Sequence, residues 1–456
     1  MQSSNKLIVC HFRRDQTGLL LTPYLEKGQV EAAKYRSRVM MMKRRVHSEA
    51  YSGYITVDKK HQSNLFFLHI LAKLAPKKAP LLLWLHGGPG KSALFSQFLE
   101  NGPLGISGKG MLYRRRHTVQ NFANVIYLDQ PPGAGFSYTK SPQGYAQSLQ
   151  DSTAAILEFL RQFLVMFPEY QNRNFFVAGE SYGARAAIGI AHHLQTQKDS
   201  GVSLKLGGVI CGVGFLGPTL DIVDSSEFLY QIGMVDERGR ATFAATIQQI
   251  RDLAEVNRTA AVLMLGNTIL HTRQSGQRSL FVRLTGYNDH GSALTYACPP
   301  QFDHYYRYAQ RPIFKRGIHV SPTARVDGDR LTVALNLGMK DYFTDISPLV
   351  QDVLDSQRVL VYSAQMDTVL PAVNLDKYFR SLNWTGAEQF RAASRQRWYS
   401  SGENPPLLGY VTTVKDLTHV LLTRAGHHAS FDQTATVYKM IKFFVSDRDF
   451  LTSYEE

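Results

Sequence analysis

The sequence is poor in cysteine and has no long apolar run. Its 456 residues include three cysteines, Cys10, Cys211 and Cys298. Three cysteines cannot build a disulfide framework, and their spacing matches no metal-binding motif. No apolar run approaches the ~18 residues that a membrane-spanning helix requires. The composition therefore excludes a disulfide-stapled scaffold and a membrane-spanning helix, and it leaves the disulfide state of the three cysteines open.

A recognisable leader is also lacking. The first residues, MQSSNKLIVCHFRRDQ, are charged and contain only a short apolar stretch, Leu7 to Cys10. A signal peptide needs an apolar region about twice that length. Two glycosylation sequons begin at Asn257 and Asn383. Since two sequons are expected by chance in a chain this long, they favour secretion only weakly.

Acidic residues are fewer than basic ones, and the formal net charge is +14. Basic residues cluster at Lys43–Arg45 and between Tyr113 and His117. No nucleic-acid-binding motif accompanies them, so we interpret both clusters as solvated surface and expect no nucleic-acid partner. A hydrophobic content of 44% and an aromatic content of 11% are typical of a globular enzyme with a large core.

Short apolar runs alternate with helical patterns along most of the chain. Residues 148–167 are amphipathic with helical spacing, and a second helical pattern covers 185–195. Strand–helix alternation predicts a mostly parallel sheet with helices on both faces. The runs that we predict as buried strands are 80–85, 124–129, 174–179, 207–213, 358–363 and 419–424.

Residues 236–310 break this rhythm. They combine a long helical pattern over 238–256 with aromatic-rich sequence, YACPPQFDHYYRY, that reads as irregular. We therefore predict one core interrupted by an insertion. Its first part is 18–219, a helical lid occupies 220–335, and the second part of the core is 336–456.

The run FFVAGESYGARAAI places a serine between two glycines where a strand meets a helix. This G-x-S-x-G pattern, Gly179 to Gly183, is typical of a nucleophile elbow, whose sharp turn exposes the serine hydroxyl. Chemistry-bearing residues follow other strands too. Asp367 follows 358–363 and His427 follows 419–424. Carboxyl ends of parallel strands share one edge of a sheet, and the order serine, acid, histidine is that of α/β hydrolases.

Taken together, the motifs of this chain make it resemble the serine carboxypeptidases of the α/β-hydrolase fold, and it is most similar to the vitellogenic type. The resemblance starts near Gly18 and covers almost all that follows. The segments that carry it are LLLWLHGGPG, LENGPLG, VIYLDQPPGAGFSYT, FFVAGESYGA, EFLYQIGMVDE, RVLVYSAQMDTVLPA and TRAGHHASFDQ.

The resemblance implies a catalytic triad in which Ser181 is the nucleophile, His427 the base and Asp367 the orienting acid. A serine is a poor nucleophile until a histidine accepts its proton, and the histidine needs a carboxylate to fix its tautomer. The resemblance also places the oxyanion hole at the backbone amides of Gly88 and Tyr182. It implies no metal and no cofactor in the reaction.

A carboxypeptidase must also recognise a free C-terminal carboxylate. The family binds this carboxylate with an amide side chain that precedes the glycines and with two glutamates. The resemblance places the binding residues of this chain at His86, Gly87, Glu100 and Glu180. Two carboxyl groups hold a substrate carboxylate only when they share protons, so we expect an acidic pH optimum.

Some positions depart from the family pattern. His86 replaces the amide, and Lys91 follows the glycine-rich turn. Both can carry positive charge, so we expect them near the substrate carboxylate. A lysine there could also obstruct the pocket or pair with one of the glutamates. His428 follows the triad histidine where the family has a hydrophobic residue.

The expected function is serine-type hydrolysis of C-terminal peptide bonds in peptide or protein substrates. One alternative is an esterase or acyltransferase that uses the same triad, and another is a weakened or non-catalytic storage or binding protein. The resemblance implies secretion or a lysosomal location, so we expect that the N-terminus is incomplete. The resemblance to this family is also compatible with a homodimer.

Overall fold

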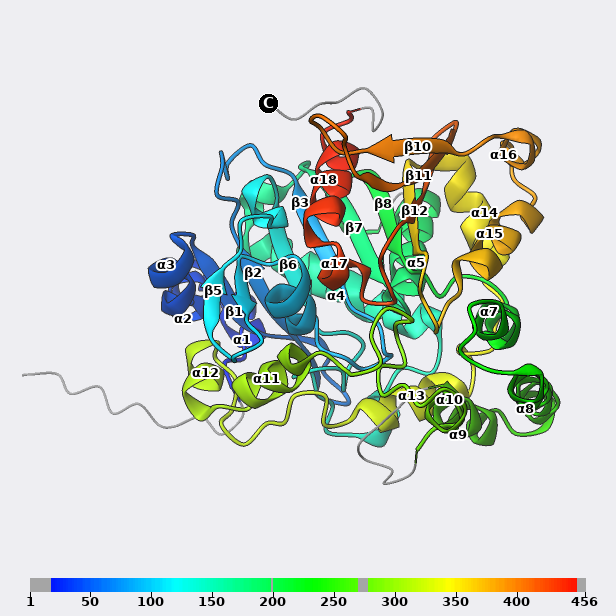
Figure 1. Cartoon of the computed structure of the whole chain (residues 1–456). Helices are drawn as coiled ribbons and strands as arrows, with labels where there is room; N and C mark the ends of the chain where they lie inside the picture. Colours follow the sequence, from blue (N-terminus) through cyan, green and yellow to red (C-terminus); the bar gives the residue numbers. More distant parts are fainter. Residues whose placement is uncertain (1–17, 198–199, 270–277, 449–456) are drawn as a thin grey trace, which may run out of the picture.

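The computed structural model describes residues 18–197, 200–269 and 278–448. Its centre is a ten-stranded sheet in the order β1-β2-β6-β3-β7-β8-β9-β12-β11-β10 (Figure 1). A small antiparallel sheet joins β4 to β5. The strands are β1 (Ala50–Asp58), β2 (Ser63–Ile70), β3 (Leu81–Leu85), β4 (Leu104–Ile106), β5 (Leu112–Arg114), β6 (Asn124–Leu128), β7 (Asn174–Glu180), β8 (Lys205–Gly212), β9 (Val359–Ala364), β10 (Gln396–Tyr399), β11 (Leu407–Val414) and β12 (Leu417–Leu422).

The central strands β6, β3, β7, β8, β9 and β12 run parallel. They are the six strands that the apolar runs predicted, and the predicted α/β class is confirmed. Their residues are apolar without alternation because helices cover both faces of a parallel sheet. The antiparallel strands β1 and β2 on one side, and β10 and β11 on the other, were not predicted.

Helices cover the two faces of the sheet. Leu81, Leu83 and Leu85 of β3 belong to the core that contains α4 and α5, whereas Leu82 and Trp84 belong to the core that contains α18. The helices are α1 (Thr22–Glu26), α2 (Val30–Ser37), α3 (Met40–Val46), α4 (Leu149–Met166), α5 (Gly183–Thr196), α6 (Thr219–Ile222), α7 (Ser226–Gln231), α8 (Glu237–Val256), α9 (Arg258–Ile269), α10 (Leu280–Thr285), α11 (Pro300–Ala309), α12 (Pro312–Gly317), α13 (Arg330–Gly338), α14 (Ser347–Ser356), α15 (Ala372–Ser381), α16 (Ala387–Ala392), α17 (Ala429–Asp432) and α18 (Thr434–Val445). Short helical turns are η1 (Ser96–Glu100), η2 (Val119–Asn121), η3 (Pro142–Gly144) and η4 (Pro168–Tyr170).

The chain between α6 and α13 adds no strand to the sheet within the described residues. In Figure 1 its helices lie along the lower and right edges of the view, outside the sheet. One part of it differs from our expectation, because α11 forms where we predicted irregular structure. Pro300 stands in its first turn, where the fixed φ of proline favours a helix. Tyr305 is then buried against Phe95, with ring centroids 5.4 Å apart.

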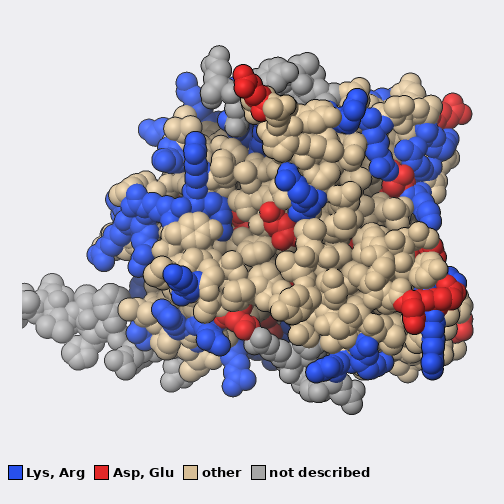
Figure 2. Space-filling model, in the orientation of Figure 1, with Lys and Arg blue, Asp and Glu red and all other residues tan. Residues whose placement is uncertain are grey.

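Basic side chains gather on the left of the face shown in Figure 2, where Figure 1 places α3. Lys43, Arg44 and Arg45 occupy the last turn of α3 and are exposed, as expected for solvated charge. Arg115 of the second basic cluster differs from our expectation, because it is buried. Within the described residues, no helix is long and apolar enough to span a bilayer.

Candidate active site

The turn from β7 into α5 carries Ser181 in a left-handed backbone conformation, with φ of 54°. The flanking glycines are needed for this turn. A Cβ on Gly179 would lie 2.2 Å from the carbonyl oxygen of Gly183, and a Cβ on Gly183 would lie 2.5 Å from that of Leu85. The backbone of Ser181 is also tied to the end of β8, since its amide donates to the carbonyl of Gly212 at 2.9 Å. The serine is therefore held at the sheet edge in a conformation that exposes its side chain.

Two hydrogen bonds join Ser181, His427 and Asp367. The Oγ of Ser181 lies 3.0 Å from Nε2 of His427, and Nδ1 of the same ring lies 2.8 Å from Oδ2 of Asp367. Asp367 follows β9 and is fully buried, and His427 lies between β12 and α17. The other oxygen of Asp367 accepts the backbone amides of Val369 and Leu370 at 2.8 and 2.9 Å. These bonds fix the carboxylate toward the ring.

The electrostatics of His427 suit a base that becomes charged. Burial disfavours the imidazolium, but the charge of Asp367 and its hydrogen bond outweigh burial, so the pKa of His427 is raised. Asp367 also directs the ring proton to Nδ1, which leaves the Nε2 lone pair facing the serine.

The glycine-rich turn after β3 packs against the elbow. A Cβ on Gly87 would lie 2.7 Å from Cβ of Ser181 and 2.8 Å from the backbone nitrogen of Tyr182. Gly88 has φ of 125°, a conformation that favours glycine. In the described part of the chain, neither the Gly88 amide nor the Tyr182 amide donates a hydrogen bond. Both amides are thus available beside the nucleophile.

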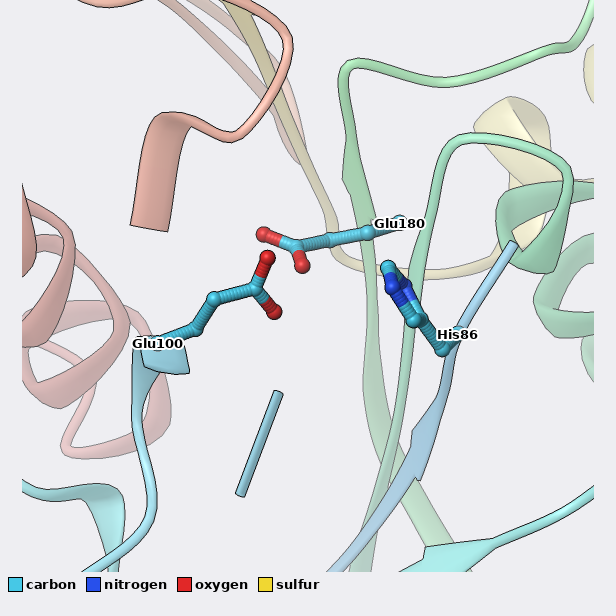
Figure 3. Close-up of side chains that lie close together, drawn as sticks. All are labelled: His86, Glu100 and Glu180. Atoms are coloured by element: carbon cyan, nitrogen blue, oxygen red, sulfur yellow. The ribbon is translucent and has the colours of Figure 1, made fainter. Parts of the chain in front are cut away.

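Three further side chains meet next to the elbow (Figure 3). Glu180 immediately precedes Ser181, His86 follows β3, and Glu100 ends η1. All three are buried, and one ligand-type atom from each lies within 4.8 Å of the others. Figure 3 shows the two carboxyl groups facing each other, with the His86 ring beside Glu180.

The two carboxyl groups share a site that disfavours negative charge. Burial and the neighbouring carboxyl group raise the pKa of Glu180 well above its ordinary value, and burial raises the pKa of Glu100. The hydrogen bond between them raises the pKa of Glu180 and lowers that of Glu100, as expected when one proton is shared.

Sequence reasoning missed the groups that orient these glutamates. The hydroxyls of Tyr362 and Ser430 each donate to Oε1 of Glu180 at 2.5 Å. The buried Arg115 donates to the carbonyls of Phe98 at 2.8 Å and Leu104 at 3.1 Å, and so fixes the turn that ends in Glu100. These contacts join residues that are far apart in the sequence. The sequence-based prediction included only Arg115 among them, and it placed Arg115 in a solvated basic surface.

His86 and Lys91 lie in environments that affect positive charge differently. Burial and the charge of Lys91 lower the pKa of His86 well below its ordinary value, which favours the neutral ring. Burial and the charge of Arg330 lower the pKa of Lys91 to about 8, so its ammonium group remains charged at acidic pH. That group lies 3.7 Å from the ring centroid of Phe95, which stacks on His86. In the described structure, Lys91 forms no ion pair with either glutamate.

His428 and a segment of the insertion also border the site. Nδ1 of His428 lies 3.6 Å from Oε1 of Glu100, and its ring packs against Phe95 at 5.1 Å. The carbonyl of Gly291 accepts the backbone amide of His427 at 2.7 Å. The sequence-based prediction gave His428 no role and did not include Gly291.

The comparisons with known proteins point to one family. Residues 41–447 match the family described as serine carboxypeptidase. Similar proteins include the venom serine carboxypeptidase of Apis mellifera, 31% identical over 95% of this chain and 91% of the relative. The vitellogenic carboxypeptidase of Aedes aegypti is 32% identical over 93% of this chain and 89% of its own length. The probable serine carboxypeptidase CPVL of Homo sapiens is 29% identical over 94% and 89% of the two chains.

A solved structure shares the fold. The prohormone-processing carboxypeptidase KEX1(delta)p from Saccharomyces cerevisiae matches with a TM-score of 0.70. The match covers 88% of this chain and 92% of that one at 19% identity. At this identity the likeness concerns the fold alone.

Proposed function

Because the chain belongs to the serine carboxypeptidase family, we propose that it hydrolyses C-terminal peptide bonds through an acyl-enzyme on Ser181. The observation that carries this assignment is the continuous hydrogen-bonded path from the serine through His427 to Asp367, with steps of 3.0 and 2.8 Å. Such a path lets a neutral histidine remove the hydroxyl proton as the oxygen attacks.

In the first half of the reaction, Oγ of Ser181 bonds to the scissile carbonyl carbon while Nε2 of His427 takes its proton. The carbonyl oxygen becomes an oxyanion, which the amides of Gly88 and Tyr182 stabilise. The carbon–nitrogen bond then breaks, and His427 gives its proton to the leaving amine. A water molecule repeats the sequence on the acyl-enzyme and restores the serine.

The glutamate pair confers the preference for a chain end. Glu180 is adjacent in sequence to the nucleophile, so a carboxylate bound to the pair places the last peptide bond near Ser181. When the two glutamates share a proton, the pair donates a hydrogen bond to the substrate carboxylate. When both glutamates are ionised, they repel the substrate carboxylate. His86 is neutral and donates through one ring nitrogen.

The glutamate pair and His427 make the activity depend on pH in opposite directions. The pKa values of Glu100 and Glu180 are raised, so substrate binding weakens as pH rises through their titration range. Protonation of His427 removes the base and limits the acid side of the profile. The expected profile is bell-shaped, with its optimum between the titration of His427 on the acid side and that of the glutamates on the alkaline side.

The test compares a blocked dipeptide with its C-terminal amide. In the double variant Glu100→Gln, Glu180→Gln, the alkaline fall in kcat/KM should flatten for the dipeptide and stay unchanged for the amide, which has no carboxylate. Ser430→Ala is the matched variant, because it removes a hydrogen bond that lowers the pKa of Glu180. It should move the alkaline limb to higher pH. An unaltered profile in both variants would contradict the assigned role.

We also propose a secretory or lysosomal location. It rests on the resemblance and on the relative named as a venom protein. Asn257 and Asn383 are both exposed, as glycosylated residues must be. Expression in an animal cell line should give a glycosidase-sensitive product whose mass falls in Asn257→Gln and Asn383→Gln. An unmodified product would count against this location.

A further inference from the structure

The cluster of His86, Glu100 and Glu180 contains polar atoms that its surroundings do not satisfy. Within the described residues, neither ring nitrogen of His86 has a hydrogen-bond partner, and the adjacent Glu100 is hydrogen-bonded to Glu180. The two side chains are only 6% and 1% exposed. A buried polar group without a hydrogen-bond partner destabilises the fold, because it has given up water and gained nothing in return. Their atoms converge with Glu180 on one small volume (Figure 3), which points to a ligand that all three can bind at once.

We propose that this cluster binds a divalent transition-metal ion of the zinc class, with a fourth coordination position open toward the substrate. Such an ion would inhibit the enzyme by occupying the place of the substrate carboxylate. The inhibition, though not the metal site itself, rests on the proposed function of the glutamate pair.

The donor set fits zinc better than the common hard cations. One imidazole nitrogen and two carboxylate oxygens are ligands that zinc accepts, and three protein ligands leave a fourth position for water or an anion. Magnesium and calcium require six or more oxygen ligands. Two ionised carboxylates also neutralise a dication, which replaces the proton shared by Glu100 and Glu180.

The side chains are already oriented for this geometry. Oε1 of Glu180 is fixed by the hydroxyls of Tyr362 and Ser430, so its other oxygen faces the cluster. The ring of His86 stacks on Phe95, with centroids 5.1 Å apart and planes inclined by 20°. Hydrogen-bonded outer partners such as the two hydroxyls orient ligands in known metal sites.

A small movement completes the site. Tetrahedral zinc with bonds of about 2.0–2.1 Å brings its ligand atoms to roughly 3.3 Å from one another. The ligand atoms here lie within 4.8 Å. Rotation of the Glu100 side chain at the end of η1 can supply the difference of about 1.5 Å.

Direct binding is measured on the Ser181→Ala protein, which removes turnover. Zinc chloride is titrated by calorimetry, with magnesium chloride as the comparison ion. His86→Asn in that background should weaken zinc binding at least tenfold, since loss of an outer partner alone costs about 10–100-fold. The control is His192→Asn, because His192 also lies near a carboxylate, 3.3 Å from Asp352, but on another part of the molecule. It should leave the affinity unchanged.

Equal zinc affinity with and without His86, or equal binding of zinc and magnesium, would overturn the site. Thermal unfolding of each variant shows whether it is folded. If His86→Asn does not fold, Glu100→Gln takes its place, with the same tenfold loss expected.

Inhibition is measured separately on the active enzyme. Zinc should raise KM for the blocked dipeptide, leave its kcat unchanged, and inhibit hydrolysis of the dipeptide amide much less. Zinc binding without this competition would overturn the inhibition and the carboxylate role of the glutamates together, while the metal site stands. No zinc binding, combined with the glutamate-dependent pH profile, would overturn the metal site and leave the proposed function intact.

Discussion

Asparagine at position 367 tests the hydrogen-bonded path most sharply, because it changes one atom and keeps the shape of the side chain. Oδ1 of Asp367 accepts two backbone amides, from Val369 and Leu370, at 2.8 and 2.9 Å. An asparagine oxygen must stay on these donors, so its NH₂ group faces Nδ1 of His427. That nitrogen then accepts a hydrogen bond, and the ring proton moves to Nε2. The ring can no longer take the proton of Ser181.

The expected loss is large. An asparagine that imposes the wrong tautomer in a triad of this geometry lowers kcat by about 10⁴-fold. At ~1.36 kcal/mol per tenfold change, this is about 5.4 kcal/mol of lost transition-state stabilisation. Removing the nucleophile with Ser181→Ala should cost more, on the order of 10⁶-fold.

The assay is steady-state hydrolysis of a blocked dipeptide, with thermal unfolding to show that the variant is folded. Asp289→Asn is the matched control, because Asp289 is another buried aspartate near His427 but accepts the amide of Gly291 at 3.0 Å instead of facing the ring. It should reduce kcat far less than Asp367→Asn. If Asp367→Asn kept kcat within tenfold of the natural enzyme, Asp367 would not be the orienting acid.

Other predictions concern stability and binding. Asp341→Ala removes the carboxylate 2.9 Å from the buried guanidinium of Arg185. It should lower the free energy of unfolding in urea by about 3–5 kcal/mol, and a loss near zero would refute the pairing argument. Lys91→Gly should raise KM for a peptide between the titration range of the glutamates and about pH 8, where the Lys91 ammonium group is still charged. A lower KM at every pH would show instead that the lysine obstructs the pocket. Burial lowers the pKa of His419 to about 4. As the pH falls from about 6.5 to 4, the unfolded chain therefore binds a proton at His419 that the folded chain does not. The free energy of unfolding falls by up to about 3 kcal/mol over this range. His419→Leu should flatten the pH dependence of thermal unfolding in this window, and an unchanged slope of unfolding temperature against pH would contradict the prediction.

The sequence predicted the central strands and the three residues that meet at their ends for the same physical reason. A strand buried on both faces is a continuous apolar run, and the residue after it lies at the edge where ligands bind. Ser181, Asp367 and His427 all follow such runs. The hairpin of β1 and β2 was missed because its connection, residues 59–62, contains no glycine or proline to mark a turn.

The surroundings of the site could not be predicted in this way. Tyr362 and Ser430 meet Glu180 from β9 and α17, and no local pattern encodes a contact across 182 or 250 residues of sequence. Arg115 stands in a run of basic residues, which ordinarily indicates a solvated surface. Its burial depends on carbonyl groups of the η1 turn, whose orientation only the folded chain provides.

The separation of the catalytic residues along the chain has a consequence for biosynthesis. Ser181 and His427 are in contact, yet they stand 246 positions apart in the sequence. At ~5–20 residues per second, a ribosome makes the base roughly 12–50 s after the nucleophile. Throughout that interval the nascent polypeptide carries a serine that nothing can activate.

The same delay applies to the sheet itself. β9 pairs with β8 and β12, and Asp367 follows β9, so neither the orienting acid nor that half of the sheet exists before residues 359–422 are synthesised. Translation order alone therefore keeps the emerging protease inert toward itself and toward neighbouring nascent chains, with no inhibitory segment required for that purpose.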